Sequence, residues 1–276
     1  MPYITNKQNN TETKIFYRDF GKGQPIILIH GWPLTGESWE LQVPALLENG
    51  FRCIAYDRRG FGKSDVPYDA YDYDSLAGDL HTIIETLNLT DVIIAGFSMG
   101  GGEVVRYFTK YGGAKVVKAA LIASIIPLVA QKPDNPDGVP KETLDEIMQA
   151  LNTDRVAFLK DFHKNFYNVS MLNKDVSQAR LDADFIVASQ ASGHATVKAA
   201  EAWGGTDFRQ ELKNVNVPVL IVHGDADNIV PIKTSGDQAA KGIADNKYIV
   251  IEGAPHGLNV THADELNTAL VNFCKG

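Results

Sequence analysis

A serine flanked by two glycines follows an apolar run and has the residue pattern of an activated nucleophile. The segment Gly96-Phe97-Ser98-Met99-Gly100 comes directly after residues 92–95, which are apolar and partly β-branched. A turn this tight between a strand and a helix strains the backbone of its central residue, and only small flanking residues let the two backbones pass closely. Such a turn would hold the hydroxyl above a sheet. The spacing favours a catalytic role for Ser98, although the bare five-residue pattern also occurs in ordinary loops.

A serine hydroxyl is a weak nucleophile, so catalysis needs a base within hydrogen-bond reach and a carboxylate that orients this base. His256 follows the apolar run 248–251, at the expected carboxyl end of a strand. Parallel strands present their carboxyl ends at one edge of a sheet, so we expect His256 near Ser98. His262 is the rival base, but it falls inside the expected final helix. His256 is therefore the predicted base.

Two acidic residues compete for the role of orienting this base. Asp225 and Asp227 both follow the apolar run 219–222. A carboxylate next to a strand end, such as Asp225, more often caps or braces the turn, whereas Asp227 lies farther out and can reach an imidazole. Asp227 is the preferred acid. The pair does not indicate calcium, because Ile229 stands where a third oxygen ligand is expected. Neither a metal-ligand spacing of Cys and His nor a haem motif occurs, so no cofactor is expected.

Two backbone amides are candidates for an oxyanion hole, which needs N–H donors aimed at the developing negative charge. Met99, the residue after the serine, provides the first. Trp32, in the loop His30-Gly31-Trp32-Pro33 after another apolar run, is placed to provide the second. Pro33 has no N–H and cannot donate, but its ring fixes the loop and restricts Trp32 to extended geometry.

The elements that must position these residues form an α/β pattern. Apolar, β-branched runs alternate with helical segments, as in a mainly parallel sheet flanked by helices. Each run is followed by a loop rich in Gly, Pro or Asp. The expected strands are residues 26–29, 53–56, 92–95, 119–122, 219–222 and 248–251, with an antiparallel edge strand at 14–20.

Strand signals stop between about Pro127 and Leu212, where helical patterns at 141–151 and 154–163 predict a helical insertion. We therefore expect residues 1–126 and 213–276 to form the α/β core, with 127–212 as a cap over the active site. The aromatic residues of this cap could line a substrate pocket, and the alternative for each is packing within the cap's own core. They include Phe158, Phe162, Phe166, Tyr167, Phe185 and Trp203.

The 276-residue chain has a formal net charge of −8 and shows no basic stripe, so nucleic acid and anionic membranes are not expected partners. Its first residues lack the charged and apolar blocks of a signal peptide, and no stretch is apolar enough to span a bilayer. A cytoplasmic location is therefore expected. Cys53 and Cys274 are the only cysteines, which argues against a disulfide framework.

Together these motifs resemble the cofactor-free haloperoxidase and aryl-esterase branch of the α/β-hydrolase family, which also includes γ-lactamases. The resemblance spans nearly the whole chain. It rests on HGWPL at 30–34, YDRRGFGKS at 56–64, YDYD at 71–74, GFSMGGGE at 96–103, NFYN at 165–168, GDADNIVP at 224–231 and GAPHGL at 253–258.

The resemblance implies an eight-stranded, mostly parallel sheet with the helical cap inserted after the sixth strand. It places the catalytic triad on Ser98, Asp227 and His256, and the oxyanion donors on Trp32 and Met99. The predicted substrate pocket comprises Pro33, Phe158, Phe162, Trp203, Ile229 and Leu258.

The expected activity is hydrolysis of a small aryl or other carboxylic ester through an acyl-enzyme. If hydrogen peroxide replaces water, the product is a peracid, which can oxidise bromide or chloride. Proline at 33 resembles the perhydrolase and haloperoxidase members, whereas some esterases carry leucine there. The γ-lactamase-like members share much of the cap, including 165–168, but can carry tyrosine where this chain has Trp32.

A γ-lactamase or amidase that uses the same triad is therefore an alternative. A ligand receptor that keeps the hydrolase fold is an alternative of another class. The expected partners are a small ester, a lactam, or a carboxylic acid with peroxide. The sequence leaves open the physiological substrate and assembly as a homo-oligomer.

Overall fold

One eight-stranded sheet carries the core, in the order β1-β2-β4-β3-β5-β6-β7-β8. The computed structural model describes residues 2–8, 11–171 and 175–276. Strands β3 to β8 pair in parallel, and β2 pairs antiparallel with both β1 and β4. The strands are β1 Tyr3–Gln8, β2 Thr11–Phe20, β3 Gln24–Ile29, β4 Phe51–Tyr56, β5 Val92–Phe97, β6 Val116–Ile122, β7 Val219–Gly224 and β8 Asn246–Ile251.

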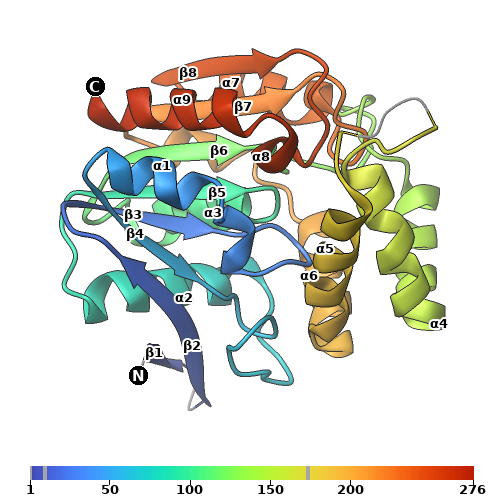
Figure 1. Ribbon diagram of the computed structural model, residues 1–276, viewed down its shortest axis with the longest axis horizontal. Helices are drawn as coiled ribbons and strands as arrows, with labels where there is room; N and C mark the ends of the chain where they lie inside the picture. The colour runs from blue at the N-terminus through green and yellow to red at the C-terminus, as the bar shows by residue number, and fades with distance from the viewer. Residues whose placement is uncertain (1, 9–10, 172–174) are drawn as a thin grey trace.

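Helices cover both faces of this sheet (Figure 1). They are α1 Gln42–Glu48, α2 Tyr73–Thr86, α3 Gly100–Tyr111, α4 Lys141–Phe166, α5 Gln178–Gln190, α6 Gly193–Gly205, α7 Gly236–Gly242, α8 Leu258–Thr261 and α9 Ala263–Lys275. Short 3-10 turns occur at Gly36–Trp39, Leu212–Asn214 and Ile232–Thr234. The predicted α/β-hydrolase fold, with a mostly parallel sheet and helices inserted after the sixth strand, is confirmed.

The central strands are apolar at every position because both of their faces are buried. Side chains of a strand point alternately to opposite faces. Ile27 and Ile29 belong to the hydrophobic cluster that includes residues of α2 and α3. Ile26 and Leu28 belong to the cluster that includes residues of α1 and α9. This two-sided burial explains why the sequence shows continuous apolar runs here rather than an alternating pattern.

The segment between β6 and β7 contains α4, α5 and α6. In Figure 1 these helices lie on the side of the sheet to which the arrowheads of β6 and β8 point. The helix α4 is interrupted at Asp154, whose φ of −147° and ψ of 81° are not helical. The Asp154 carboxylate accepts a hydrogen bond from the Ala157 N–H at 3.0 Å and so caps the second half of α4. The two predicted helical patterns, 141–151 and 154–163, therefore lie on either side of this kink.

Both cysteines are free and buried. Burial raises the pKa of the Cys53 thiol to about 12 and that of Cys274 to about 11. Because the thiolate is the reactive form, we expect neither cysteine to react with a thiol reagent such as dithionitrobenzoate in the native protein at pH 8. After unfolding in guanidinium, two thiols per chain should react. Rapid labelling of native protein, or fewer than two reactive thiols after unfolding, would contradict this assignment.

Candidate active site

Ser98 occupies a turn between β5 and α3 that glycines allow to close. Its φ is +52°, in the left-handed region that non-glycine residues rarely adopt. A Cβ atom on Gly96 would lie 2.5 Å from the carbonyl group of Gly100, and one on Gly100 would lie 2.6 Å from the Ile29 oxygen. The Ser98 N–H donates to the Ile122 carbonyl at 2.9 Å. The neighbouring strands thus hold the serine in the strained geometry expected of a nucleophile elbow.

Because the turn closes tightly, we expect one methyl group added at Gly96 to lower the free energy of unfolding strongly. In Gly96→Ala the new Cβ would collide with backbone atoms, which cannot rotate away, so we expect a loss of about 2 kcal/mol or more in the free energy of unfolding. Gly205→Ala is the matched control, because nothing lies within 4 Å of a Cβ at Gly205. Chemical denaturation of both variants measures the difference, and equal stabilities would contradict the tight-turn account.

Ser98, His256 and Asp227 form a continuous hydrogen-bonded chain. His256 Nε2 lies 2.9 Å from Ser98 Oγ, and His256 Nδ1 lies 2.7 Å from Asp227 Oδ2. A carboxylate only accepts hydrogen bonds, so Nδ1 carries the proton and Nε2 is left to accept from the serine hydroxyl. All three residues are buried. The geometry equips the hydroxyl with an adjacent base and the base with an orienting acid.

The Asp227 carboxylate is held in its ionised form by its surroundings. Its Oδ1 accepts hydrogen bonds from the N–H groups of Ile229 at 2.9 Å and Val230 at 2.8 Å. His223 Nε2 lies 3.2 Å from Oδ2. Burial acts to raise the pKa of Asp227, but the imidazoles of His256 and His223 outweigh burial and hold this pKa well below its ordinary value.

The two rivals of the predicted triad residues have other partners. Asp225 is exposed, and its Oδ1 accepts a hydrogen bond from the Gly253 N–H at 2.6 Å, so it braces the loop after β8. His262 stands between α8 and α9, where its Nδ1 lies 2.9 Å from Thr261 Oγ1. The structure therefore brings Asp227 and His256, rather than Asp225 and His262, to Ser98.

The loop after β3 places Trp32 beside the elbow. The Trp32–Pro33 peptide is cis, and the Leu34 N–H donates to the Gly31 carbonyl at 3.1 Å, which closes a turn with the proline at its third position. A Cβ on Gly31 would lie 3.1 Å from the Ser98 Cβ, so the loop passes against the serine. Within the described part of the chain, the backbone N–H groups of Trp32 and Met99 donate to no protein acceptor, although both residues are buried. Both amides are thus available to an external oxyanion.

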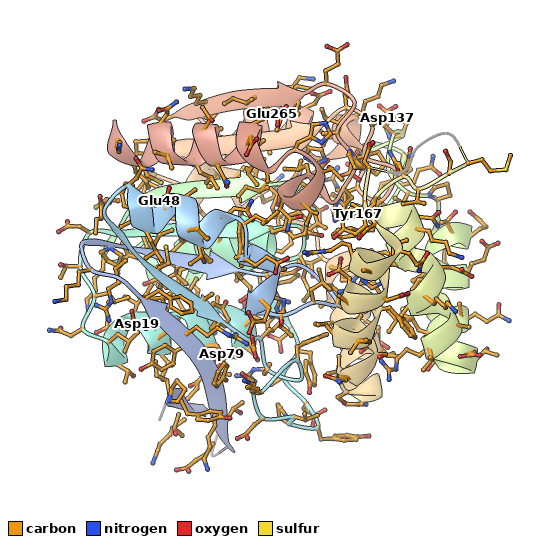
Figure 2. The ribbon with its side chains drawn as sticks, viewed as in Figure 1. Asp19, Glu48, Asp79, Asp137, Tyr167 and Glu265 are labelled. Carbon is orange, nitrogen blue, oxygen red and sulfur yellow. The ribbon has the colours of Figure 1, made fainter. Side chains whose placement is uncertain are left out.

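The end of α4 packs on the base. The rings of Phe166 and His256 lie 5.0 Å apart edge to face, and the Gly257 N–H donates to the Phe166 carbonyl at 2.9 Å. The Tyr167 hydroxyl donates to Asp184 in α5 at 2.5 Å, and Figure 2 shows Tyr167 where these helices meet the core. The helices between β6 and β7 thereby support the loop that carries His256.

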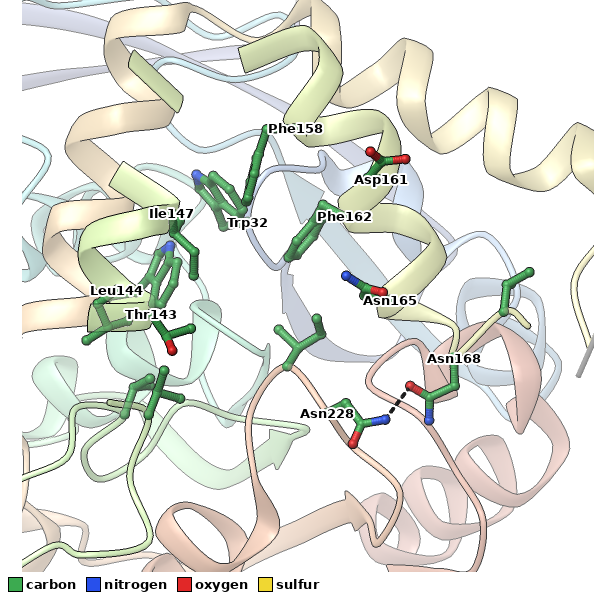
Figure 3. Close-up of a pocket in the computed structure, with 15 residues that line it drawn as sticks. Trp32, Thr143, Leu144, Ile147, Phe158, Asp161, Phe162, Asn165, Asn168 and Asn228 are labelled. Carbon is green, nitrogen blue, oxygen red and sulfur yellow. Dashed lines mark hydrogen bonds between the residues drawn. The ribbon is translucent and has the colours of Figure 1, made fainter. Parts of the chain in front are cut away.

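An apolar cavity of about 630 Å³ lies beside this site. Figure 3 shows the rings of Trp32, Phe158 and Phe162 on its wall, with the amides of Asn168 and Asn228 at another part of the lining. Its remaining lining residues are Val129, Val139, Thr143, Leu144, Ile147, Asp161, Asn165, Val169, Trp203 and Ile229. This volume is within the range of small-molecule sites, and the predominance of apolar and aromatic walls suits an uncharged ligand.

The cavity adjoins the triad through two residues. Trp32 lines it and offers its backbone to the elbow, and Ile229 lines it and donates its N–H to Asp227. Of the predicted pocket residues, Trp203, Phe158, Phe162 and Ile229 line this cavity. Pro33 and Leu258 are buried but are not among its lining residues; Leu258 packs instead in the core cluster with α9.

Two further buried histidines, His30 and His223, lie at this site, and each precedes a glycine at the end of a strand. His223 contributes to the acid's environment through its contact with Asp227. His30 contacts the loop of Trp32, since its Nδ1 lies 2.8 Å from the Gly31 oxygen. A histidine before glycine at a strand end is the signal they share, but that signal does not identify the partner.

Among residues 2–8, 11–171 and 175–276, no group of three or more His, Cys, Asp or Glu side chains has an arrangement that could hold a metal ion. In the same ranges, no helix combines the length and the apolar character needed to cross a membrane.

Comparison with known proteins supports this fold. A model of the alpha/beta hydrolase fold matches residues 24–263. The chain belongs to the α/β-hydrolase family, in the branch that contains the non-heme haloperoxidases.

The similar proteins include both peroxidases and esterases. The chain is 38% identical over 275 residues to the non-heme chloroperoxidase of Kitasatospora aureofaciens, with 99% of each covered. It is 36% identical over 278 residues to the bifunctional esterase/perhydrolase of Acinetobacter calcoaceticus, with 100% of each covered. The crystal structure of a bromoperoxidase from Bacillus anthracis superposes with a TM-score of 0.95 at 42% identity, covering 99% of each chain.

Proposed function

We propose that this protein is a serine esterase that cleaves small carboxylic esters, aryl esters among them, through an acyl-enzyme on Ser98. We further propose that hydrogen peroxide can replace water in the second step. The observation that carries the proposal is the hydrogen-bonded chain from Ser98 Oγ through His256 to Asp227. The bifunctional esterase/perhydrolase similar to this chain supports the pairing of the two activities.

In the first step, Ser98 Oγ attacks the ester carbonyl carbon while His256 Nε2 takes the hydroxyl proton. The ionised Asp227 stabilises the imidazolium that forms, and the carbonyl oxygen, now an oxyanion, accepts hydrogen bonds from the N–H groups of Trp32 and Met99. Collapse of this intermediate breaks the bond to the leaving alcohol or phenol, which receives the proton from His256. The acyl group remains on Ser98.

In the second step, His256 takes a proton from water, whose oxygen attacks the acyl carbon. Ser98 leaves with the proton returned by His256, and the carboxylic acid is released. Hydrogen peroxide in the place of water gives a peracid by the same proton transfers. The O–O bond of the peracid then breaks as its terminal OH group passes to bromide, which yields hypobromous acid and the carboxylate. One triad thus accounts for both an esterase and a haloperoxidase activity.

Residues 127–212 serve in this proposal as a cap whose α4 and α6 enclose the ester. The lining of the cavity supports this role of the cap. It includes Phe158 and Phe162 from α4 and Trp203 from α6, beside Trp32. Their rings lie between 5.3 and 6.4 Å from that of Trp32. The lactamase and receptor alternatives are not favoured by the relatives, whose names are chloroperoxidase and esterase/perhydrolase. The cytoplasmic location and the oligomeric state stay predictions.

The proposal is tested by supplying purified protein with phenyl acetate, first alone and then with hydrogen peroxide and bromide. We expect repeated turnover of the ester, and peracetic acid and bromination of a phenol indicator when peroxide is present. Turnover of a bicyclic γ-lactam in preference to phenyl acetate would favour the lactamase instead. Stoichiometric ligand binding without turnover would favour a receptor.

A further inference from the structure

The peptide group that carries the Trp32 N–H is held from its opposite side. The Gly31 carbonyl belongs to this group, and it accepts hydrogen bonds from His30 Nδ1 at 2.8 Å and from the Leu34 N–H at 3.1 Å. The cis bonds lie at Trp32–Pro33 and Ile126–Pro127, so the Gly31–Trp32 peptide is trans. In a planar trans peptide the N–H points away from the C=O. Contacts that fix the carbonyl of Gly31 therefore also aim the N–H of Trp32.

The protonation state of His30 is determined by Arg58. The backbone N–H of Arg58 donates to His30 Nε2 at 2.9 Å, so this nitrogen must be unprotonated. The proton of the neutral ring then sits on Nδ1, where it faces the Gly31 oxygen at 2.8 Å; Arg58 Nη1 lies farther from Nδ1, at 3.4 Å. His30 is fully buried, and burial together with the positive charge of Arg58 holds the pKa of His30 well below its ordinary value. The ring is therefore a neutral donor with one orientation.

Arg58 also connects this loop to the helix that follows the serine. Its Nη2 donates to the His30 carbonyl at 2.6 Å, and its Nε donates to Glu103 Oε1 at 2.6 Å. Glu103 lies in the first turn of α3, which begins directly after Met99, and it also accepts from the hydroxyl of Tyr56. The side chains of Arg58 and Glu103 are both fully buried. The two predicted oxyanion donors, Trp32 and Met99, thus stand on segments joined by one buried ion pair.

We propose that His30 is a positioning residue, which aims the Trp32 N–H at the oxyanion by donating from Nδ1 to the Gly31 carbonyl. This inference rests on the proposed esterase function. The backbone N–H of Arg58 maintains the tautomer of His30. The side chain of Arg58, paired with Glu103, ties the loop to α3. His30 itself touches neither substrate nor Ser98, so its effect is expected in the transition state rather than in binding of the ester.

Two amide substitutions separate this role from simple packing. In His30→Asn the side-chain NH₂ takes the place of Nδ1 and can still donate to Gly31. In His30→Gln the amide reaches the place of Nε2, so it can meet the Arg58 N–H but leaves the Gly31 carbonyl without its side-chain donor. We expect kcat for phenyl acetate to fall less than about 5-fold in His30→Asn and about 10- to 100-fold in His30→Gln. The larger fall stays below the loss of about 10²–10³ in kcat that follows removal of a whole oxyanion-hole donor. KM should stay within about 3-fold of the wild-type value in both variants.

Ligand affinities provide the readout that a merely structural role would not move. Phenylboronic acid forms a tetrahedral adduct with a serine, so its affinity for His30→Gln should fall by the same factor as kcat. The affinity for acetate, the reaction product, should not change. His163→Gln is the matched control, because His163 is also buried and its Nδ1 also faces a backbone carbonyl, that of Leu159, at 2.7 Å. His163→Gln should leave the ratio of the affinities for phenylboronic acid and acetate unchanged. Equal losses in both His30 variants, or a normal kcat in His30→Gln, would overturn the proposal.

The tautomer can be tested without any variant, which keeps the proposal falsifiable if the His30 variants do not fold. Nitrogen-15 NMR of the wild-type protein should show His30 protonated at Nδ1 and unprotonated at Nε2 between pH 5 and pH 9. An imidazolium, or a ring protonated at Nε2, would overturn the positioning role. If the wild-type protein instead shows this tautomer but cleaves no ester, the esterase proposal fails while the geometry of His30 stands.

Discussion

Replacing Ser98 by alanine is expected to lower kcat for a short aryl acetate by about 10⁶-fold. The substitution removes the only atom that would form the acyl bond, and the bonded base His256 has no other described serine within hydrogen-bond reach. Because the side chain loses only one buried hydroxyl, the protein should stay folded. Steady-state kinetics with thermal unfolding as the check on folding measures both effects.

The control for this substitution is Ser124→Ala. Ser124 is also buried near the elbow, but its Oγ accepts from the Ile126 N–H at 3.3 Å rather than contacting His256. We expect its kcat within about 5-fold of the wild type. A folded Ser98→Ala protein that keeps more than about one per cent of the wild-type rate would show that another group performs the chemistry.

Replacing Asp227 by asparagine is the second large effect, with an expected fall in kcat of about 10⁴-fold. An asparagine amide that donates towards Nδ1 would favour the tautomer with the proton on Nε2, and this nitrogen could then no longer accept from Ser98. The imidazolium formed during attack would also lose its negative partner. Kinetics of hydrolysis at neutral pH, where the lowered pKa keeps the wild-type Asp227 ionised, gives the comparison.

Asp225→Asn provides the matched comparison from the same loop. Asp225 is exposed and accepts from the Gly253 N–H, and an asparagine oxygen can still accept there. We expect kcat to change less than about 5-fold. A larger loss in Asp225→Asn than in Asp227→Asn would reverse the assignment of the acid.

The central strands were predictable because burial on both faces leaves a continuous apolar run. The edge strand β1 was not expected from its residues, which include Ile4 as the only buried apolar side chain. Its second inward residue, Asn6, is buried because its amide donates to Asp79 in α2 at 2.6 Å. A polar residue satisfied by a partner 73 positions away leaves no hydrophobic pattern in the local sequence. Only the family resemblance implied an eighth strand.

The residues of the proposed triad could be predicted because each of them follows a strand, and the carboxyl ends of parallel strands meet at one edge. The choice of Asp227 over Asp225 followed from position in the turn alone. The residues that support the site could not be predicted from their position after a strand. Arg58 reaches His30 and Glu103, 28 and 45 positions away, through side-chain contacts that only the packed core defines.

The residues that line the pocket were predicted only in part. Aromatic residues on α4 and α6 indicated an apolar wall, and Phe158, Phe162 and Trp203 line the cavity. Leu258 follows the base in sequence but points into the core, because short α8 packs beside α9. Closeness in sequence to a catalytic residue does not specify which side of a loop faces the cavity.

The central claim is that water and peroxide compete for one acyl-enzyme on Ser98, and the leaving group provides its most direct test. Phenyl acetate and 4-nitrophenyl acetate should give the same acetyl-enzyme after their different phenols depart. At a fixed peroxide concentration, the ratio of peracetic acid to acetic acid formed by the enzyme should therefore be the same for both esters, although their rates of cleavage differ. A ratio that changes with the leaving group would contradict a shared acyl-enzyme.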